Sequence, residues 1–352
     1  MKEIKANNYS IFFNDEGYIE LYNHIQFENY SKIFIHLDNN TNTHCLKVFL
    51  KKIKKINYQT IISNPGEENK NIESTIFLWD KLSNNNGDRK SLIINLGGGV
   101  VGDMGGFVAS TFKRGISYIN MPTTLLSMVD ASIGGKTGID LGSLKNQIGT
   151  FCDPKMVIID PLYLETLDKS ELISGYAEVF KHSLISEKSF FEKLISQENS
   201  IDFKNLDTIK TSVKIKKKIV LLDKEELKER KALNFGHTLG HAIESHFLKN
   251  NQKLLHGEAI GIGIVLAAFI SNKILDFPID KLRTIKYHIL KIFKRVDFKK
   301  SEIEKIIKLL IHDKKNSHGK INFILLKDIG KPMYDIEVEN KLILESFNFY
   351  LS

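Results

Sequence analysis

The sequence predicts an α/β protein with a doubly wound parallel sheet in its first half and helices in its second half. Short apolar runs alternate with helix-periodic stretches up to about residue 165, an alternation typical of βαβ units. After Asp160 and Pro161 the apolar spacing becomes helical almost throughout. Because 352 residues exceed one ordinary core, we expect two domains, 1–165 and 166–352.

The expected elements follow one another in the order that this fold class requires. In the first domain the strands are KIFIHL (32–37), YQTIIS (58–63), SLIINL (91–96), SYINM (117–121) and MVIID (156–160), with helices over 47–55 and 73–82. In the second domain the clearest helices span 171–185, 209–222, 257–274 and 303–311, and INFILL (321–326) is the only late strand expected.

Composition is that of a globular protein, with 42% hydrophobic and 26% charged residues. The longest apolar run, Ala259 to Ile270, is too short to span a bilayer, and the polar start MKEIKANNYS lacks the apolar stretch of a signal peptide. Two cysteines, Cys45 and Cys152, do not suggest a disulfide framework. We therefore expect a cytoplasmic protein without a membrane partner.

The formal charge of +8 raises the question of a nucleic-acid partner. The lysines are spread through stretches such as KVFLKKIKK and VKIKKK, at helical spacing with apolar residues between them. Solvated lysine faces of amphipathic helices explain this pattern, and the sequence contains no zinc-finger, RNP or helix-turn-helix motif. We expect no nucleic-acid partner.

A glycine-rich turn follows the third predicted strand. Leu92 to Leu96 is an apolar run, Gly97 to Gly99 form a tight turn, and we expect a helix from Gly102 onward. Glycines in such a turn let backbone N–H groups and a helix N-terminus approach a pyrophosphate. The spacing GGGVVGD is not the common GxGxxG, and glycine turns also serve as plain connections.

A second motif has the spacing of metal ligands. HTLGH places His237 and His241 at i and i+4 on one face of a helix, and Glu178 and His256 lie on neighbouring apolar helices. Spacing alone favours the two histidines of HTLGH as zinc ligands, whereas His256 at a helix start has the context of a structural residue. The other histidines, His36 among them, have no comparable context.

Several further motifs accompany these two. GGGVVGD, FKRG (112–115), MPTTLL (121–126), VDASIGGKTG (129–138), KNQIG (145–149), GYAEVFKH (175–182), NFGHTLGHAIE (234–244) and LHGE (255–258) occur in this order. Over residues 38–315 the chain thereby resembles the 3-dehydroquinate synthase family of the sugar phosphate cyclase superfamily. The resemblance implies a Rossmann-like N-terminal domain, an all-α C-terminal domain, and an active site in the cleft between them. It also implies NAD, a divalent metal (zinc or cobalt) and a homodimer.

The resemblance also implies roles for individual residues. The metal ligands would be Glu178, His237 and His256, with His241 in contact with the substrate. The residues implied in catalysis or substrate binding are Arg114, Asp130, Lys136, Lys145, Asn146, Lys181, Lys216, Arg230, Asn234 and His241.

Within this set the charges divide between the two ends of the substrate. Lys136, Lys145 and Asn146 would hold a phosphate beside the nicotinamide, while Lys216, Arg230 and one of Lys314 or Lys315 would meet a carboxylate. Asp130 and Lys181 would bond hydroxyls, and Arg114 would reach across the dimer interface. We expect one helix face to present Arg230, Asn234 and His237 together. Alternatively, Lys136 or Lys145 caps a loop carbonyl, and Lys216 belongs to a solvated lysine face.

Contacts with NAD are expected along the first domain. The matching positions are Asp38, Asn40, Glu67, Lys70, Gly98, Gly99, Val100, Val101, Gly102, Asp103, Thr123, Thr124, Lys136, Lys145, Tyr163, Leu164, Glu165 and Thr166. Of these, Gly99 to Asp103 match the pyrophosphate turn, and Tyr163 to Thr166 match a stretch that closes over the cofactor.

The implied activity is conversion of a seven-carbon heptulosonate phosphate into 3-dehydroquinate and phosphate, in the shikimate pathway of aromatic amino acid biosynthesis. It proceeds by NAD-dependent oxidation, phosphate elimination, reduction and an intramolecular aldol step. The loop GIDLGSLKN departs from the family pattern at Asp140 and at Ser143 and Leu144, so a valiolone-type cyclase remains an alternative. A metal-dependent polyol dehydrogenase would not need Lys136, Lys145, Asn146 and Arg230.

Overall fold

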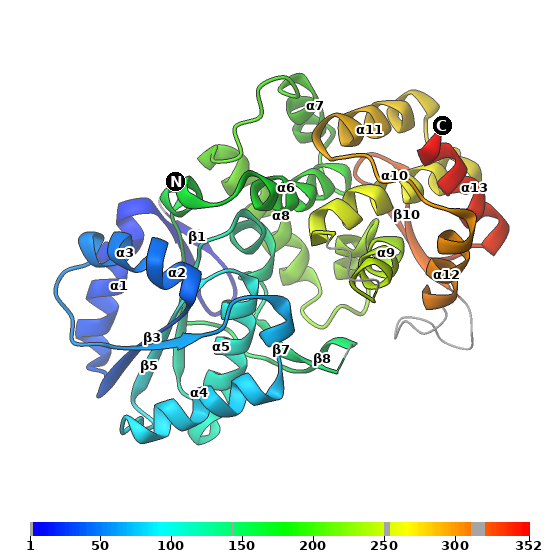
Figure 1. The fold of residues 1–352 in the computed structure, drawn as a ribbon. Helices are drawn as coiled ribbons and strands as arrows, with labels where there is room; N and C mark the ends of the chain where they lie inside the picture. The colour runs from blue at the N-terminus through cyan, green and yellow to red at the C-terminus, as the bar shows by residue number, and fades with distance from the viewer. Residues whose placement is uncertain (1–2, 143, 250–253, 311–320) are drawn as a thin grey trace. The chain divides into compact units, whose positions relative to one another are not determined.

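The computed structural model describes residues 3–142, 144–249, 254–310 and 321–352. Its contacts divide the chain into two compact units (Figure 1). The first unit comprises residues 1–168 and 204–217, and the second comprises residues 169–203 and 218–352. The predicted domains, 1–165 and 166–352, have a single boundary, whereas in the structure Lys204–Lys217 belongs to the first unit.

The first unit is built on a seven-stranded sheet with the order β1-β2-β9-β6-β5-β3-β4. All neighbouring pairs are parallel except β1 with β2. The strands are β1 (Glu3–Lys5), β2 (Ser10–Phe13), β3 (Lys32–Asp38), β4 (Gln59–Ser63), β5 (Ser91–Gly97), β6 (Ser117–Pro122) and β9 (Met156–Ile159). The predicted doubly wound parallel sheet is therefore confirmed, with β1 and β2 as additions at one edge.

Helices cover this sheet, and the closest approach is made by α5 (Gly99–Thr111). A Cβ at Gly105 would lie 1.9 Å from Asn95 Oδ1, and one at Gly106 would lie 2.4 Å from Thr137 Cγ2. Glycine is therefore required where this helix is pressed between its neighbours. The other helices of the unit are α1 (Asn14–Glu28), α2 (Asn39–His44), α3 (Leu46–Lys52), α4 (Ile72–Asn84) and most of α8 (Leu206–Leu222).

An antiparallel hairpin that the sequence analysis did not predict follows the sheet strands. It consists of β7 (Lys136–Leu141) and β8 (Leu144–Phe151), and it packs against α5 through Thr137. The hairpin carries Lys136, Lys145 and Asn146, which were predicted to bind the phosphate of the substrate.

The second unit is mainly helical, as predicted, but it is not all-α. Its helices are α6 (Lys169–Leu184), α7 (Lys188–Ser196), α9 (His237–Lys249), α10 (His256–Leu275), α11 (Ile279–Ile292), α12 (Lys300–Leu310) and α13 (Asn340–Leu351). The expected strand is β10 (Asn322–Asp328), and it pairs with β11 (Lys331–Glu337), which was not expected. Gly330 turns between them at φ 75°, and the half-exposed sequence KPMYDIE gives β11 little apolar pattern.

Helix α10 forms the centre of this unit. It has 20 residues, and its most apolar window has a mean hydropathy of 1.7, so its length and composition would suffice to span a membrane. The apolar run Ala259 to Ile270 forms only the middle of this helix. Within the fold, however, 67% of that window is buried, against α6, α9, α11, α13 and β10. Burial among other elements is the ordinary state of a core helix.

Candidate functional site

The glycine turn of the first unit opens a pocket at the start of α5. The helix begins at Gly99, three residues earlier than predicted, with Gly98 as its N-cap. A Cβ at Gly97 would lie 2.5 Å from Val101 Cβ, so this glycine allows the turn to close. The pocket is lined by Asn95, Gly97, Gly98, Gly99, Gly102, Asp103, Asn120, Pro122, Ser127, Ala131 and Ser132.

Gly102 differs from the other glycines of this helix. A Cβ there would meet no atom within 4 Å among the described residues, so the packing of the protein does not require glycine. The open space lies over the first turn, where backbone N–H groups have no helical partner and the helix dipole is positive. This arrangement suits the close approach of an anionic group.

Lys70 joins residues that the sequence analysis assigned to two different ligands. Its ammonium group lies 2.6 Å from both Asp103 Oδ2 and Asn146 Oδ1, and the side chain is buried. Burial alone would lower the pKa of Lys70, but the charges of Asp103 and Glu67 outweigh it and raise this pKa. Lys70 therefore stays charged and connects β8 to α5 at Asp103, just after the first turn of the helix.

The departure from the family pattern at Asp140 has a structural role in the same network. Asp140 Oδ1 accepts a hydrogen bond of 2.7 Å from the backbone N–H of Asn146, whose φ is 52°. The Asp140 N–H in turn donates to the carbonyl of Lys70 at 2.8 Å. Asp140 thus holds Asn146 in the left-handed conformation that directs its amide toward Lys70.

The two lysines predicted to bind phosphate lie on the hairpin. Lys145 Nζ is 3.7 Å from Glu67 Oε1, and both side chains are partly exposed. Lys136 is exposed, with its ammonium group 5.9 Å from the centroid of the Phe151 ring. Both lysines are therefore accessible cations.

Several other positions predicted to contact the cofactor have side chains or backbone groups that are buried in the core or bonded to other residues of the chain. Asp38 caps α2 by accepting from the Thr41 N–H at 2.7 Å. Tyr163 and Leu164 are 2% and 1% exposed, so their side chains belong to the core. The backbone N–H of Thr123 donates to Gly97 O at 3.0 Å and fixes the glycine turn. Exposed positions in these stretches are Asn40, Glu165 and Thr166.

Asp130 and Lys216, predicted to contact the substrate, are paired in the first unit. Lys216 Nζ donates to Asp130 O at 2.6 Å and lies 2.8 Å from Asp130 Oδ1. Lys216 is only 5% exposed, so the alternative of a solvated lysine face was wrong. Asp130 lies in a short π-helical turn, η3 (Ser127–Ala131).

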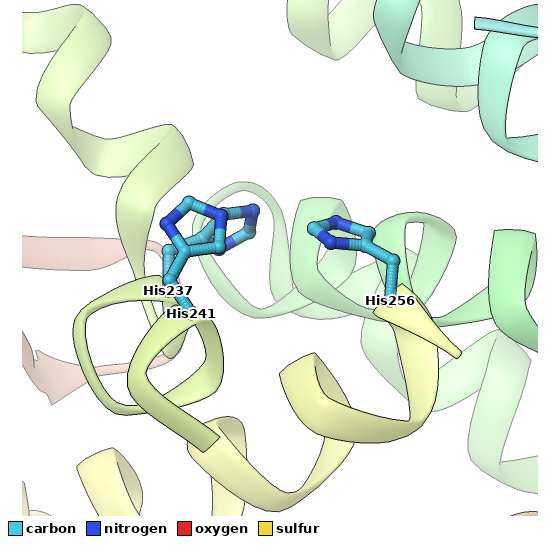
Figure 2. Close-up of side chains that lie close together, drawn as sticks. All are labelled: His237, His241 and His256. Carbon is cyan, nitrogen blue, oxygen red and sulfur yellow. The ribbon is translucent and has the colours of Figure 1, made fainter. Parts of the chain in front are cut away.

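The second unit brings His237, His241 and His256 together (Figure 2), and Glu178 lies beside two of them. Glu178 of α6 is 1% exposed, and its Oε1 lies 3.2 Å from His237 Nε2 and 3.4 Å from His256 Nε2. Nitrogen atoms of His237, His241 and His256 lie within 4.8 Å of one another. Both the spacing argument, which selected His241, and the family resemblance, which selected Glu178, therefore point to residues of one cluster.

Hydrogen bonds on the far side of two imidazoles fix how they face the cluster. His237 Nδ1 lies 3.2 Å from the carbonyl oxygen of Phe235, and His256 Nδ1 lies 3.3 Å from Glu244 Oε2. Because both partners are acceptors, each Nδ1 carries the proton. In a neutral imidazole the Nε2 lone pair then faces Glu178. Sequence reasoning missed Glu244, although it lies seven residues after His237, two helical turns along the same face.

The cluster has a strong internal field. Burial alone would raise the pKa of Glu178, but the charges of Lys181 and His237 outweigh it and hold this pKa well below its usual range. Burial and the Lys181 charge lower the pKa of His237. Burial would also lower the pKa of His256, but its bonds to Glu178 and Glu244 raise it to about 9. Lys181, 1% exposed, forms an ion pair with Glu178.

The expectation of one helix face carrying Arg230, Asn234 and His237 was wrong. Arg230 and Asn234 lie in a separate 3₁₀ segment, η5 (Glu229–Asn234), and α9 begins only at His237. Gly236 separates them at φ 79°, and a Cβ there would lie 2.9 Å from the backbone nitrogen of Ile264. Close packing against α10 therefore requires the glycine that breaks the helix.

The segment before Arg230 is organised by an aspartate that the sequence analysis did not single out. Asp223 accepts from the N–H groups of Leu227, Lys228 and Arg230 at 3.0, 2.6 and 3.1 Å. Arg230 itself is 3% exposed and donates from Nη1 to the carbonyl of Lys224.

Arg114 lies away from these groups along the chain, at the end of α5. It is exposed and has φ 70°, next to Lys113 at φ 52°. Left-handed backbone at two successive residues with side chains is unfavourable, and such strain is often associated with function. Lys314 and Lys315 lie outside the described residues.

Comparison with solved structures places this fold among the sugar phosphate cyclases. A 2-deoxy-scyllo-inosose synthase complexed with carbaglucose-6-phosphate, NAD⁺ and Co²⁺ superposes with a TM-score of 0.85. The two sequences are 26% identical, and the match covers 98% of this chain and 99% of the other.

Sequence comparison identifies the family within this class. Residues 60–174 match the family described as 3-dehydroquinate synthase N-terminal, and residues 175–316 match 3-dehydroquinate synthase C-terminal. The 3-dehydroquinate synthase of Parabacteroides distasonis is 41% identical over 91% of this chain and 92% of its own. The corresponding enzyme of Pelagibacter ubique is 39% identical over 89% and 87%. The chain belongs to the 3-dehydroquinate synthase family, which confirms the resemblance.

Proposed function

We propose that the chain converts 3-deoxy-D-arabino-heptulosonate 7-phosphate into 3-dehydroquinate and phosphate, and is therefore a carbon–oxygen lyase. The observation that carries this proposal is the buried convergence of Glu178, His237 and His256 in a chain of the 3-dehydroquinate synthase family. The proposed substrate is an anion at both ends, and the candidate sites contain cations suited to each.

The proposal includes a divalent metal bound by Glu178, His237 and His256. With both Nδ1 atoms donating elsewhere, the two Nε2 atoms, once unprotonated, and Glu178 Oε1 direct lone pairs into the same space. Among the described residues the oxygens of Glu178 have no hydrogen bond of normal geometry, and they are met instead by the two imidazoles at 3.2 and 3.4 Å and by the Lys181 ammonium group. Only protons or a cation can satisfy three converging lone pairs.

The donor set and its spacing suit zinc or cobalt. Imidazole nitrogen and carboxylate oxygen are ordinary ligands of both ions, and three protein ligands leave a position for substrate. Ligands about 2.0–2.1 Å from zinc in a tetrahedron lie roughly 3.3 Å apart. The separations of 3.2 and 3.4 Å agree with that value. His241, whose ring nitrogen belongs to the same cluster, is proposed to contact a substrate hydroxyl.

The pocket at the start of α5 is the proposed NAD site. Gly98 to Asp103 leave the backbone and the open space over Gly102 for a pyrophosphate, and Lys70 fixes Asp103 at the rim. The inosose synthase with which this fold superposes holds NAD⁺ and Co²⁺. When bound, NAD would accept a hydride from the substrate carbon whose hydroxyl group the metal polarises, that hydroxyl losing its proton, and would later return the hydride.

The protein groups then have to bind and orient the substrate. Lys136, Lys145 and Asn146 are proposed to hold its phosphate, and the first two are accessible cations on the hairpin. Arg230 and Lys216 are proposed to meet its carboxylate, for which a guanidinium offers a bidentate partner. Asp130 and Lys181 are proposed to bond its hydroxyls.

We further propose a cytoplasmic homodimer in which Arg114 reaches the neighbouring subunit. Its exposed side chain on strained backbone is consistent with a role outside its own fold. Cross-linking would test whether the protein is a dimer. Arg114→Ala should lose turnover, and turnover should return when this variant forms mixed dimers with subunits that keep Arg114.

A comparison of two sugar phosphates tests the activity. The carboxylated heptulosonate phosphate should be converted at least about 100-fold more efficiently than sedoheptulose 7-phosphate, because a buried arginine left without its carboxylate costs a few kcal/mol. In Arg230→Gln this ratio should fall while turnover of the neutral sugar changes little. Comparable rates on the two sugars, or preference for the neutral one, would instead indicate a valiolone-type cyclase.

A further inference from the structure

Four polar side chains form a continuous hydrogen-bonded line across the sheet of the first unit. They come from four adjacent strands: Ser63 from β4, His36 from β3, Asn95 from β5 and Asn120 from β6. The strand register accounts for their alignment, since His36 pairs with Asn95 and Asn95 pairs with Asn120. We call these four residues the polar line.

The polar line is buried along its whole length. Ser63, His36, Asn95 and Asn120 are 4%, 2%, 1% and 7% exposed. A Cβ at Gly105 of α5 would lie 1.9 Å from Asn95 Oδ1 and 2.7 Å from His36 Nδ1. The helix backbone therefore closes directly over the line and excludes water. Apolar side chains would fill this layer at lower cost, because buried polar groups must first lose their hydration.

The line has a defined direction. Asn95 donates from Nδ2 to Asn120 Oδ1 at 3.0 Å, so its Oδ1 is the acceptor 3.3 Å from His36 Nδ1. His36 must then carry its proton on Nδ1, and its Nε2 is the acceptor 3.2 Å from the Ser63 hydroxyl, which also lies 3.4 Å from the carbonyl oxygen of Leu37. Burial lowers the pKa of His36 to about 4, so the imidazole is neutral at physiological pH. Each group donates to the next, from Ser63 to Asn120.

The line ends at the pocket over the glycine turn. Asn95 and Asn120 both line it, together with Gly98, Gly99 and Gly102. Asn120 Oδ1 accepts from Asn95, which leaves the two N–H donors of the amide and the second lone pair of Oδ1. Among the described residues no acceptor meets these donors. If the polar line served only to pair buried polar groups with one another, its last residue would not leave N–H donors unpaired at the wall of a pocket.

We propose that His36 is a positioning residue that acts through Asn95 to hold the Asn120 amide with its N–H donors toward the dinucleotide pocket. The acceptor would be an oxygen of bound NAD, on its pyrophosphate or ribose. This inference rests on the proposed function, which places NAD in this pocket. If His36 is removed, the side-chain amides of Asn95 and Asn120 can both rotate by half a turn. The Asn120 amide would then present its carbonyl oxygen to the pocket, and this oxygen repels an acceptor on NAD.

Titration of NAD⁺ into the full-length, metal-loaded protein by calorimetry tests the inference. His36→Leu should weaken NAD⁺ binding about tenfold, the effect of one lost hydrogen bond to a charged or strongly polar acceptor. Asn120→Ala should do the same, and the double variant should be no weaker than either single variant, because one interaction is lost in all three. His36→Gln, whose amide can donate to Asn95 and accept from Ser63, should recover most of the affinity.

The matched control is His24→Leu. His24 lies in the same unit on α1, and its Nε2 is 2.9 Å from the hydroxyl of Tyr30, so the substitution also removes an imidazole paired with a hydroxyl. NAD⁺ affinity should not change in this variant.

Two results would overturn the inference. One is wild-type NAD⁺ affinity in folded His36→Leu, or in Ser63→Ala if His36→Leu does not fold. The other is a ¹⁵N spectrum of the free protein that shows the His36 proton on Nε2. Failure of the unsubstituted protein to bind NAD⁺ would refute the proposed function itself, so the two failures are distinguishable.

Discussion

The pocket of the first unit and the histidine cluster of the second unit prepare for their ligands in opposite ways. At the start of α5 the chain omits side chains: Gly102 leaves open space that no neighbouring atom fills. Around Glu178 it concentrates them, with Lys181 and three imidazoles about a carboxylate that is 1% exposed. One candidate site offers backbone groups and free volume to a ligand, and the other offers buried charge.

This difference has energetic consequences. An open glycine contributes nothing to the core, so filling it should affect ligand binding alone. A buried carboxylate opposite two imidazoles is costly in isolation and is balanced only by its partners. We therefore expect changes in the pocket to separate binding from stability, and changes in the cluster to alter both.

The largest expected effect is loss of the metal. Exhaustive chelation should abolish turnover, and zinc or cobalt should restore it, because Glu178, His237 and His256 would hold the ion. His256→Ala should resemble the chelated protein and should not recover when zinc is added. Full activity in demonstrably metal-free protein, measured by phosphate release and atomic emission, would remove the metal assignment.

Next in size is the loss of a phosphate-binding cation. Lys136→Ala should lower turnover by several orders of magnitude while the free energy of unfolding changes by less than about 1 kcal/mol, because the side chain is exposed. Lys136→Arg should retain part of the activity because it keeps the charge. Unfolding of the alanine variant would make Lys136 structural and would transfer the phosphate role to Lys145.

A smaller effect on stability distinguishes the charged cluster from a surface ion pair. In metal-free protein, Glu178→Ala should destabilise the fold by about 3–5 kcal/mol, because it removes the carboxylate that pairs with the buried Lys181 ammonium group. The control is Glu192→Ala, which breaks an exposed pair with Lys188 at 3.2 Å and should cost less than about 0.5 kcal/mol. Equal losses in denaturant titrations would contradict the contrast between the two sites.

The smallest expected effects compare two glycines of one helix. Gly102→Ala should leave stability unchanged or raise it by up to about 1 kcal/mol, since alanine favours a helix, while NAD⁺ binding weakens about tenfold. Gly105→Ala should instead destabilise the fold, because its Cβ would overlap Asn95. Thermal unfolding and calorimetry of both variants check this. Unchanged NAD⁺ affinity in Gly102→Ala would place the ligand elsewhere.

The features that could be predicted from the sequence are those formed by contacts between residues close together in the chain. The strand, glycine turn and helix around Gly97 to Gly102 follow from neighbouring residues, and only the helix start was misplaced. The Lys70 network joins residues 33 and 76 positions apart, so it required the fold. The polar line likewise requires the register that pairs His36 with Asn95 and Asn95 with Asn120.

Two misjudged features did leave traces in the sequence. Gly236 between Asn234 and His237 could have indicated that the helix breaks there, since glycine readily adopts positive φ. Glu244 could have been found by extending the face of HTLGH by one turn. The pairing of Lys216 with Asp130 had no such trace, because a buried lysine and a solvated one have the same helical spacing.

Phosphate release measured together with NADH absorbance tests the central claim most directly. The protein is given zinc, the carboxylated heptulosonate phosphate and less NAD⁺ than substrate. If both sites serve one reaction that regenerates its cofactor, many phosphates will be released per NAD⁺, dehydroquinate will form, and no NADH will accumulate. Stoichiometric accumulation of NADH without phosphate release would identify a dehydrogenase and contradict the account.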